Sequence, residues 1–376
     1  MRILMLCFEY PPLGGGGSKV VNGLSRELAR FGHEIDIVTM GYRGLPKHEH
    51  FDGVNIYRLR PVRRDKSVCH TIEMAMHDLL AVPFVVKLIN RKQYDLNHTH
   101  FIFPDGLTAL LAHKLTGLPY IITAHGSDVP GYNPDRFTYQ HKLFAPMWHV
   151  IVRNSRKIIC PSENLRSLVV ARRKTVGTCI IPNALDPLKF SHRCEKHTRV
   201  LIVTRMFQRK GVQKILKVLE TTDFPFEFNI VGDGPYLETL RRIAAKLNTS
   251  IKFWGWLDND SRELKDLYET SSIFIFLSSS ENFPINLLEA MAAGMAIITN
   301  SESGCSEVVG NAALKVNPED ANDIRDSLLK LSNDPKLCKE LGMQARQRFE
   351  NHFTWSNVAQ QHDRLYREIA KSETLE

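Results

Sequence analysis

Short apolar runs alternate with longer amphipathic segments along the whole chain. The short runs predict buried strands, and the segments between them place apolar residues at helical spacing. Strands that alternate with helices in this way are typical of β-α-β units on a parallel sheet. The first series of predicted strands is RILMLCF (2–8), EIDIVTM (34–40), VNIYRL (54–59), YDLNHTHF (94–101), PYIITAHG (119–126) and KIICPS (157–162).

The pattern restarts after a polar stretch, SHRCEKHT (191–198). A chain of 376 residues exceeds the roughly 250 to 300 at which one hydrophobic core stops growing, so two domains are expected. We predict an α/β protein with two Rossmann-like, doubly wound parallel sheets, joined near residue 185 and facing an interdomain cleft. The second series is RVLIVTR (199–205), FEFNIVGDGP (226–235), SIKFWGW (250–256), IFIFLSSS (273–280), AIITNSESG (296–304) and AALKV (312–316).

Composition narrows the class of protein. Hydrophobic residues make up 43% and charged residues 24%, and no apolar stretch of about 18 residues predicts a membrane span. The first strand is not read as a secretory signal, because Glu9 and two prolines follow it. The seven cysteines are scattered singly, which favours a reducing cytoplasm over a disulfide framework or a zinc site.

The net charge of +8 is unevenly distributed. Residues 1–185 carry 24 Lys and Arg against 14 Asp and Glu, whereas residues 186–376 carry 25 against 27. The first half should therefore attract anions, such as a phosphorylated small molecule, an anionic lipid surface or nucleic acid. A basic face that only aids solubility is the alternative.

A glycine run, PPLGGGGSKVV (11–21), follows the first predicted strand and opens a helix. Glycines allow close approach to the backbone, and the N–H groups of a helix start attract anions, so this glycine run is a candidate ligand-binding loop. A flexible loop explains the glycines as well. NAD binding is not expected, because Lys19 replaces the third glycine of a dinucleotide fingerprint and EIDIVTM ends without an acidic residue.

Two cations follow the first strand of the second series. Arg205 ends the strand and Lys210 stands five residues later. Such a pair can hold a pyrophosphate and stabilise charge on a leaving phosphate without a metal ion, although a solvated basic loop is the alternative. A tight glycine turn in IVGDGP is sufficient explanation for Asp233, and the DND triplet at 258–260 lacks the further carboxylates of a metal site.

Histidines cluster after two strands of the first series. His125 in AHGSD could orient or exchange a proton with a hydroxyl, and Asp128 could either join it or cap the next segment. His98 and His100 are predicted to face opposite sides of their strand, as packing or acceptor-side residues.

The segment ENFPINLLEAMAAG places two carboxylates on either side of a helix start. Pro284 disfavours helix at the preceding residue, so Glu281 should lie in a loop and Glu289 two turns inside the helix. The free N–H groups between them form an anion site, which one glutamate could flank with sugar contacts and the other with ribose contacts. An ordinary exposed Glu289 is the alternative.

With these residues in place, the chain resembles the retaining glycosyltransferases of family four, which have the GT-B fold. The resemblance extends over nearly the whole length, and the order and spacing of its motifs are specific. The matching segments are YPPLGGGGS, LARFGHEIDIVT, TAHGSD, IIPNALD, RMFQRKG, IVGDGP, ENFPINLLEAMAAG, GCSEVV and FTWSNVAQQHDRLY.

The resemblance implies transfer of a sugar from a nucleotide-sugar donor to a hydroxyl acceptor with retention of configuration. It implies no cofactor and no metal, since the nucleotide sugar is a co-substrate; we expect a UDP-sugar, with GDP-mannose as the other candidate. The departing phosphate oxygen would take the acceptor proton, so no side-chain nucleophile is needed. The implied domains are 1–184 on the acceptor side, 185–355 for the nucleotide sugar, and a returning helix at 356–376.

Roles carried over by position give a set of expected site residues. Catalytic roles are implied for His125, Arg205, Lys210 and Glu281, and acceptor-side positions are His98, His125 and Asp128. The implied donor-binding positions are Gly15, Gly16, Arg205, Lys210, Gly232, Glu281, Asn282, Phe283, Ile285, Asn286, Leu287 and Glu289.

Two departures from the family pattern bear on specificity. Asn282 and Pro284 stand where the family usually has glycines, which removes a backbone donor and adds an amide near the donor sugar, and Ala184 also replaces a usual glycine. The basic first half suggests an anionic or lipid-linked acceptor, and residues 137–157 mix aromatic and basic residues that suit either a membrane interface or a buried helix. We therefore expect a cytoplasmic protein, with peripheral contact at the inner membrane face as an option and no nucleic acid partner. A nucleotide-sugar epimerase and a catalytically silent binding protein are the alternatives.

Overall fold

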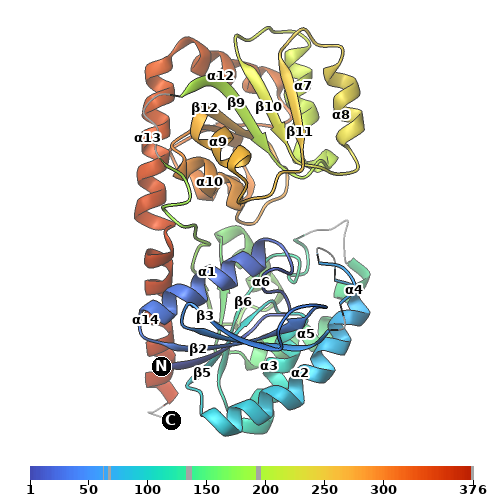
Figure 1. The fold of residues 1–376 in the computed structure, drawn as a ribbon, viewed down its shortest axis with the longest axis vertical. Coiled ribbons are helices and arrows are strands. Elements are labelled where there is room, and N and C mark those ends of the chain that lie inside the picture. Colours follow the sequence, from blue (N-terminus) through green and yellow to red (C-terminus); the bar gives the residue numbers. More distant parts are fainter. Residues whose placement is uncertain (62, 67–68, 133–137, 192–195, 374–376) are drawn as a thin grey trace. The chain divides into compact units, whose positions relative to one another are not determined.

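A computed structural model describes residues 1–61, 63–66, 69–132, 138–191 and 196–373 (Figure 1). The chain divides into two compact units. Unit 1 combines residues 1–184 with 355–376, and unit 2 comprises residues 185–354. The predicted domain limits at 184 and 355 lie within one residue of this division.

Unit 1 is built on an eight-stranded sheet in the order β3-β4-β2-β1-β5-β6-β7-β8. Its neighbouring strands pair in parallel, except that β3 runs antiparallel to β4 at the edge. The elements of unit 1 are β1 (Arg2–Leu6), α1 (Gly16–Arg30), β2 (Glu34–Gly41), β3 (His48–Phe51), β4 (Val54–Pro61), α2 (Thr71–Lys92), β5 (Leu96–His100), α3 (Asp105–Thr116), β6 (Tyr120–Thr123), α4 (Thr138–Leu143), α5 (Ala145–Asn154), β7 (Lys157–Cys160), α6 (Glu163–Arg172), β8 (Thr178–Ile180) and α14 (Trp355–Glu373).

Helices cover both faces of this sheet because successive side chains of a buried strand point in opposite directions. Leu4 and Leu6 of β1 pack with α2, α3, α5 and α6, whereas Ile3 and Met5 pack with α1 and α14. The final helix lies against α1 (Figure 1). A Cβ atom on Gly23 of α1 would lie 2.1 Å from the Trp355 indole, so only glycine lets the two helices approach this closely.

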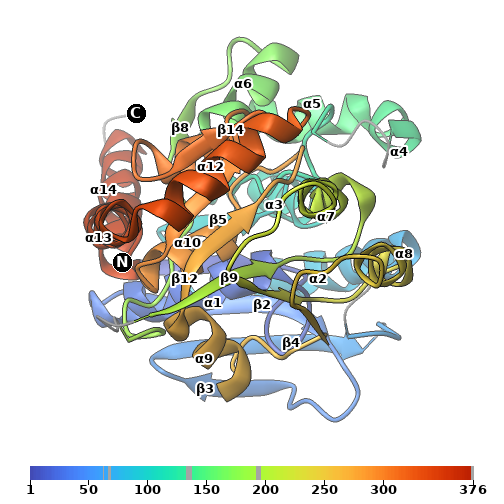
Figure 2. The same ribbon diagram turned by 90° about the horizontal axis from the view of Figure 1, so that it is seen from above.

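Unit 2 is a six-stranded parallel sheet in the order β11-β10-β9-β12-β13-β14. One hydrophobic cluster joins the sheet to α7, α8 and α12, and the other joins it to α9, α10, α11 and α13; Figure 2 shows α9 and α7 on opposite sides of β9. The elements of unit 2 are β9 (His197–Val203), η1 (Gln208–Lys210), α7 (Val212–Leu219), β10 (Glu227–Val231), α8 (Leu237–Ala244), β11 (Ile251–Gly255), α9 (Arg262–Thr270), β12 (Ser271–Phe276), α10 (Ile285–Ala292), β13 (Ala296–Asn300), α11 (Ser303–Val309), β14 (Leu314–Val316), α12 (Ala321–Asn333) and α13 (Pro335–His352).

The predicted fold class, two parallel α/β sheets, is confirmed. Within the described residues, no helix combines the length and the apolar character needed to cross a bilayer.

Candidate functional site

The loops after β9, β10 and β12 lie at one edge of the unit 2 sheet, because parallel strands bring their carboxyl ends together. Two close contacts join the first two loops. Gly232 has φ +133°, and a Cβ atom on it would lie 1.8 Å from the Thr204 carbonyl oxygen. Gly234 has φ +153°, and its Cβ atom would lie 2.6 Å from the Met206 carbonyl oxygen. Both turns therefore require glycine, which accounts for Gly232 structurally.

This edge brings Lys210 together with Glu281. Lys210 ends η1, and Gly211 after it (φ +77°) packs on the backbone of Leu277, which follows β12 and leads to Glu281. The Lys210 ammonium donates to Glu281 Oε1, and the two side chains are only 12% and 13% exposed. This low exposure distinguishes the Lys210–Glu281 pair from salt bridges on the solvated surface. Arg205 lies in the same loop as Lys210 and is exposed.

The second glutamate, Glu289, is buried on α10. Its Oε1 accepts a hydrogen bond from the Lys189 ammonium at 2.5 Å, and its Oε2 accepts one from the Tyr268 hydroxyl at 3.0 Å. Burial, followed by the charge of Glu289, raises the pKa of Tyr268, so its hydroxyl keeps its proton and remains a donor. The alternative of an exposed helical glutamate is wrong here.

The chain between the two glutamates forms the start of α10. Pro284 caps the helix with extended geometry (ψ 120°), and no side chain caps it, so the first N–H groups of α10 face outward from the helix end. Phe283 and Leu287 are buried in the unit 2 core, where Phe283 stacks edge-on against Phe353. The side chains of Phe283 and Leu287 therefore pack in the core under the helix start. Only the backbone groups of these two residues can reach a ligand.

Neighbouring polar residues fix the position of this helix start. The Asn286 amide donates to the Val203 carbonyl at 2.8 Å, which ties α10 to the end of β9. Asn282 is buried, and a Cβ atom on Gly304 would lie 1.7 Å from its carbonyl oxygen. The Gly304 N–H donates to the Glu281 carbonyl at 3.1 Å, so the start of α11 supports the Glu281 loop. Ile285 is half-buried in the first turn.

In unit 1, the glycine run lies next to His125. Gly15 precedes α1 without a side-chain cap, and a Cβ atom on Gly16 would meet open space. A Cβ atom on Gly17 would lie 2.7 Å from the Phe101 ring and 3.6 Å from His125 Nδ1. The start of α1 and the imidazole therefore form one local site. Burial lowers the pKa of His125 to about 4, so the ring is neutral near pH 7.

The two histidines of β5 lie on the same face of the strand, which corrects the sequence prediction. Residues two apart in a strand point the same way, and the ring centroids of His98 and His100 are 4.3 Å apart. His98 is fully buried between the Tyr366 hydroxyl (2.6 Å) and the Thr123 hydroxyl (2.8 Å). Both of its nitrogens are occupied, which favours the packing role over the acceptor-side role that the sequence analysis also offered for His98. His100 Nδ1 instead lies 3.1 Å from His125 Nε2.

Asp128 is buried and accepts hydrogen bonds from backbone N–H groups that precede it in the chain. Its Oδ1 accepts hydrogen bonds from the N–H groups of His125 (3.0 Å) and Gly126 (2.8 Å), and its Oδ2 accepts one from the Ile102 N–H (2.8 Å). All three donors precede Asp128 in the chain, so these contacts are not the capping of the next segment that the sequence analysis offered. Asp128 thereby fixes the loop that carries His125.

The sequence of the chain matches two known protein families. The family described as "Glycosyltransferase Family 4" matches residues 14–188, and the one described as "Glycosyl transferases group 1" matches residues 187–348. Together they account for both units. The chain belongs to glycosyltransferase family 4.

Relatives of this glycosyltransferase match it from end to end. An uncharacterized glycosyltransferase of Methanocaldococcus jannaschii is 25% identical over 98% of each chain. N-acetyl-alpha-D-glucosaminyl L-malate synthase of Bacillus anthracis is 25% identical over 99% of this chain and 98% of its own.

Among solved structures, sucrose-phosphate synthase of Thermosynechococcus elongatus superposes with a TM-score of 0.79 at 22% identity, over 99% of each chain. HepE of Anabaena, solved with UDP and glucose, gives a TM-score of 0.74 at 15% identity, over 98% of this chain and 100% of its own. These likenesses establish the GT-B fold.

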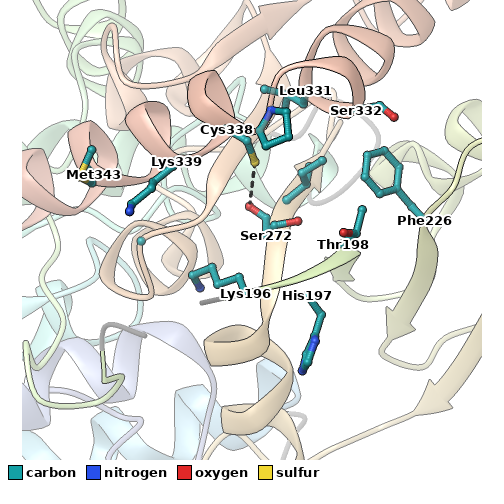
Figure 3. Close-up of a pocket in the computed structure, with 13 residues that line it drawn as sticks. Lys196, His197, Thr198, Phe226, Ser272, Leu331, Ser332, Cys338, Lys339 and Met343 are labelled. Atoms are coloured by element: carbon teal, nitrogen blue, oxygen red, sulfur yellow. Dashed lines mark hydrogen bonds between the residues drawn. The ribbon is translucent and has the colours of Figure 1, made fainter. Parts of the chain in front are cut away.

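Unit 2 contains a hollow of about 1020 Å³, whose lining residues are drawn in Figure 3. It is lined by Lys196, His197 and Ser272 at the amino ends of β9 and β12, the edge opposite the two glutamate loops. We therefore assign it no part in the glycosyltransferase site. Within the described residues, no group of three His, Cys, Asp or Glu side chains is placed to hold a metal ion.

The structure adds three residues to the candidate site that the sequence analysis missed. Lys189 follows the IIPNALD segment, but nothing in its local pattern points to a carboxylate 100 residues away. Tyr268 occurs in the apolar stripe of α9, where it resembles an ordinary core residue. Gly304 lies in the quoted GCSEVV segment, and that motif was the one signal available for its role.

Proposed function

We propose that this family 4 enzyme transfers a hexosyl or N-acetylhexosaminyl group from a nucleotide sugar, a UDP-sugar in the first instance, to a hydroxyl acceptor. The transfer retains the anomeric configuration and uses no bound metal. GDP-mannose is the other donor to test. No observation favours an epimerase or a silent binding protein on the same fold.

The observation that carries the proposal is the group of charges around the start of α10. Lys210 pairs with Glu281 beside the helix start, and Lys189, from the segment before β9, pairs with Glu289 in the second turn of the helix. The lysine cation and helix N–H groups suit a diphosphate, while carboxylate oxygens suit hydroxyl groups of a sugar and a ribose. HepE, which shares the fold, was solved with UDP and glucose, and this supports UDP as the first candidate.

The chemistry follows from these groups. The bond between the sugar anomeric carbon and the diphosphate oxygen breaks, and a bond from the acceptor oxygen to the same carbon forms on the same face. The acceptor proton passes to the departing phosphate oxygen, which Lys210 and Arg205 stabilise as negative charge develops. His125, neutral near pH 7, exchanges hydrogen bonds with the reacting hydroxyls without acting as a fixed charge.

The acceptor is proposed to be anionic or lipid-linked, and the enzyme to work in the cytoplasm at the inner membrane face. The excess of basic residues in the first half supports this. Phe137, at the start of the predicted 137–157 interface segment, lies outside the described residues. In the remainder, Trp148, Ile151 and Val152 are buried, which supports the buried-helix alternative for α5.

The test is a thermal-shift and turnover experiment with EDTA present. We expect UDP and one or more UDP-sugars to raise the melting temperature of the wild type. A ligand present at 100 times its dissociation constant stabilises the folded state by roughly 2.7 kcal/mol. Lys210→Ala should abolish the shift, whereas Lys214→Ala on the neighbouring helix should keep it. Proton NMR of the product should show the donor's anomeric configuration. Stabilisation by no sugar nucleotide, or an inverted product, would refute the proposal.

A further inference from the structure

The first half of helix α2, residues 71–80, exposes apolar side chains and buries polar ones, whereas its second half packs apolar residues on the core. Ile72, Met76 and Leu79 follow one another at helical spacing on one face, and they are 71%, 46% and 77% exposed. Pro83 continues the same stripe and is exposed as well. A helix on the surface of a globular protein normally turns such a stripe toward the core, so this face is suited to an apolar environment.

The outward direction of this stripe is fixed by buried polar contacts on the inner side of α2. Glu73 accepts hydrogen bonds from the N–H groups of His70 (2.8 Å) and Arg64 (3.0 Å). Asp78 accepts one from the Thr108 hydroxyl of α3 at 2.9 Å. Glu73 and Asp78 are the two carboxylates of α2, and both are buried. A rotation that turned Ile72, Met76 and Leu79 inward would therefore break these hydrogen bonds.

Helix α3 extends the apolar surface. Leu111 and Leu115, one turn apart, are 39% and 68% exposed. Leu115 lines a hollow of about 650 Å³ together with Val82 and Val86 of α2, so the two stripes are continuous. Figure 1 shows α2 and α3 side by side at the margin of unit 1. We call the exposed residues of α2 and α3 the α2/α3 face.

The charges on this face have one sign. All residues of 71–92 and 105–116 are described, and every carboxylate among them is buried, including Asp105 of α3. The exposed ionic side chains are Lys87, Arg91 and Lys114. A soluble surface normally mixes both signs, whereas an apolar stripe bordered by Lys and Arg alone matches the boundary of an anionic bilayer.

We propose that the α2/α3 face docks unit 1 on an anionic lipid bilayer, with Ile72, Met76 and Leu79 inserted at the headgroup level. Lys87, Arg91 and Lys114 then contact lipid phosphates. The inference rests on the proposed function in one respect: docking would place the enzyme where a lipid-linked acceptor resides. It also places the membrane contact away from residues 137–157, for which the sequence offered a membrane interface with a buried helix as the alternative.

The experiment is vesicle co-sedimentation of the full chain, with phosphatidylcholine vesicles and with vesicles containing 30% phosphatidylglycerol. We expect at least about tenfold tighter binding to the anionic vesicles, weakened by 1 M salt. Leu79→Ser and the double variant Lys87→Glu/Arg91→Glu should each reduce that binding at least about tenfold.

Matched controls lie on unit 2, where Leu188 is 85% exposed. Leu188→Ser and the exposed-lysine pair Lys336→Glu/Lys339→Glu should leave vesicle binding unchanged. Equal binding to both vesicle types, or equal binding by Leu79→Ser and the wild type, would overturn the proposal. So would sedimentation showing a dimer that Leu79→Ser dissociates, because the face would then join two copies. UDP-induced thermal shifts on the same variants report separately on the proposed function.

Discussion

Removing Lys210 tests the ion pair at the centre of the candidate site. The Lys210→Ala substitution leaves Glu281 only 13% exposed and without its cation. Breaking a buried pair by removing one partner costs about 3–5 kcal/mol, and exposed pairs contribute about 0–1, so we expect about 2 kcal/mol here. For a domain of the size of unit 2, this corresponds to a fall of about 4–8 °C in melting temperature.

The assay is calorimetry of a double-mutant cycle. Lys210→Ala and Glu281→Ala should each destabilise the protein, and the double variant should lose about 1–2 kcal/mol less than their sum. The matched control is Lys214→Ala, since Lys214 pairs with Glu319, which is 77% exposed; its melting temperature should change by less than about 2 °C. Additive effects at Lys210 and Glu281, or a Lys210→Ala change no larger than the control, would refute the reasoning.

Three further predictions concern single hydrogen-bonding or titrating groups. Burial raises the pKa of Asp78 from 3.8 to about 8; between these values the folded state holds a proton that the unfolded state has lost. Stability should therefore fall as pH rises from about 4 to 8, by up to about 1.4 kcal/mol per pH unit, and Asp78→Asn should flatten this slope in urea melts. His100→Asn keeps a donor near the Nδ1 position that meets His125, whereas His100→Gln does not. Only the glutamine variant should lose about fivefold in kcat, measured as UDP release, and equal losses would exclude a positioning role. Tyr268→Phe removes the 3.0 Å bond to Glu289 and should raise the Kd for UDP about fivefold by calorimetry; an unchanged Kd would contradict a ribose role for that glutamate.

The two sheets were predictable from the sequence because buried parallel strands are near-continuous apolar runs. Edge strand β3 was not, since its sequence HEHF is polar and gains its order from pairing with β4. The outward face of α2 was also missed. Ile72, Met76 and Leu79 have the spacing of a core stripe, and the contacts of Glu73 and Asp78 hold these residues outward.

The candidate site was also predictable only in part. Glu281 and Glu289 were predictable as a pair because a proline and a helix pattern fix their local geometry. Their partners were not, since Lys210 and Lys189 reach them across 71 and 100 residues of chain. The opposite-face prediction for the β5 histidines was an error of strand periodicity, and the fixed period of two corrects it at His100.

The central claim is that the start of α10 and its two lysine–glutamate pairs bind a nucleoside diphosphate without metal. Isothermal titration of UDP into the wild type, with EDTA present, tests it most directly. The account predicts one site per chain, lost in Lys210→Met, weakened in Lys189→Met and unchanged in Lys214→Met. Absence of binding by UDP and GDP, or binding that appears only when Mg²⁺ is added, would contradict it.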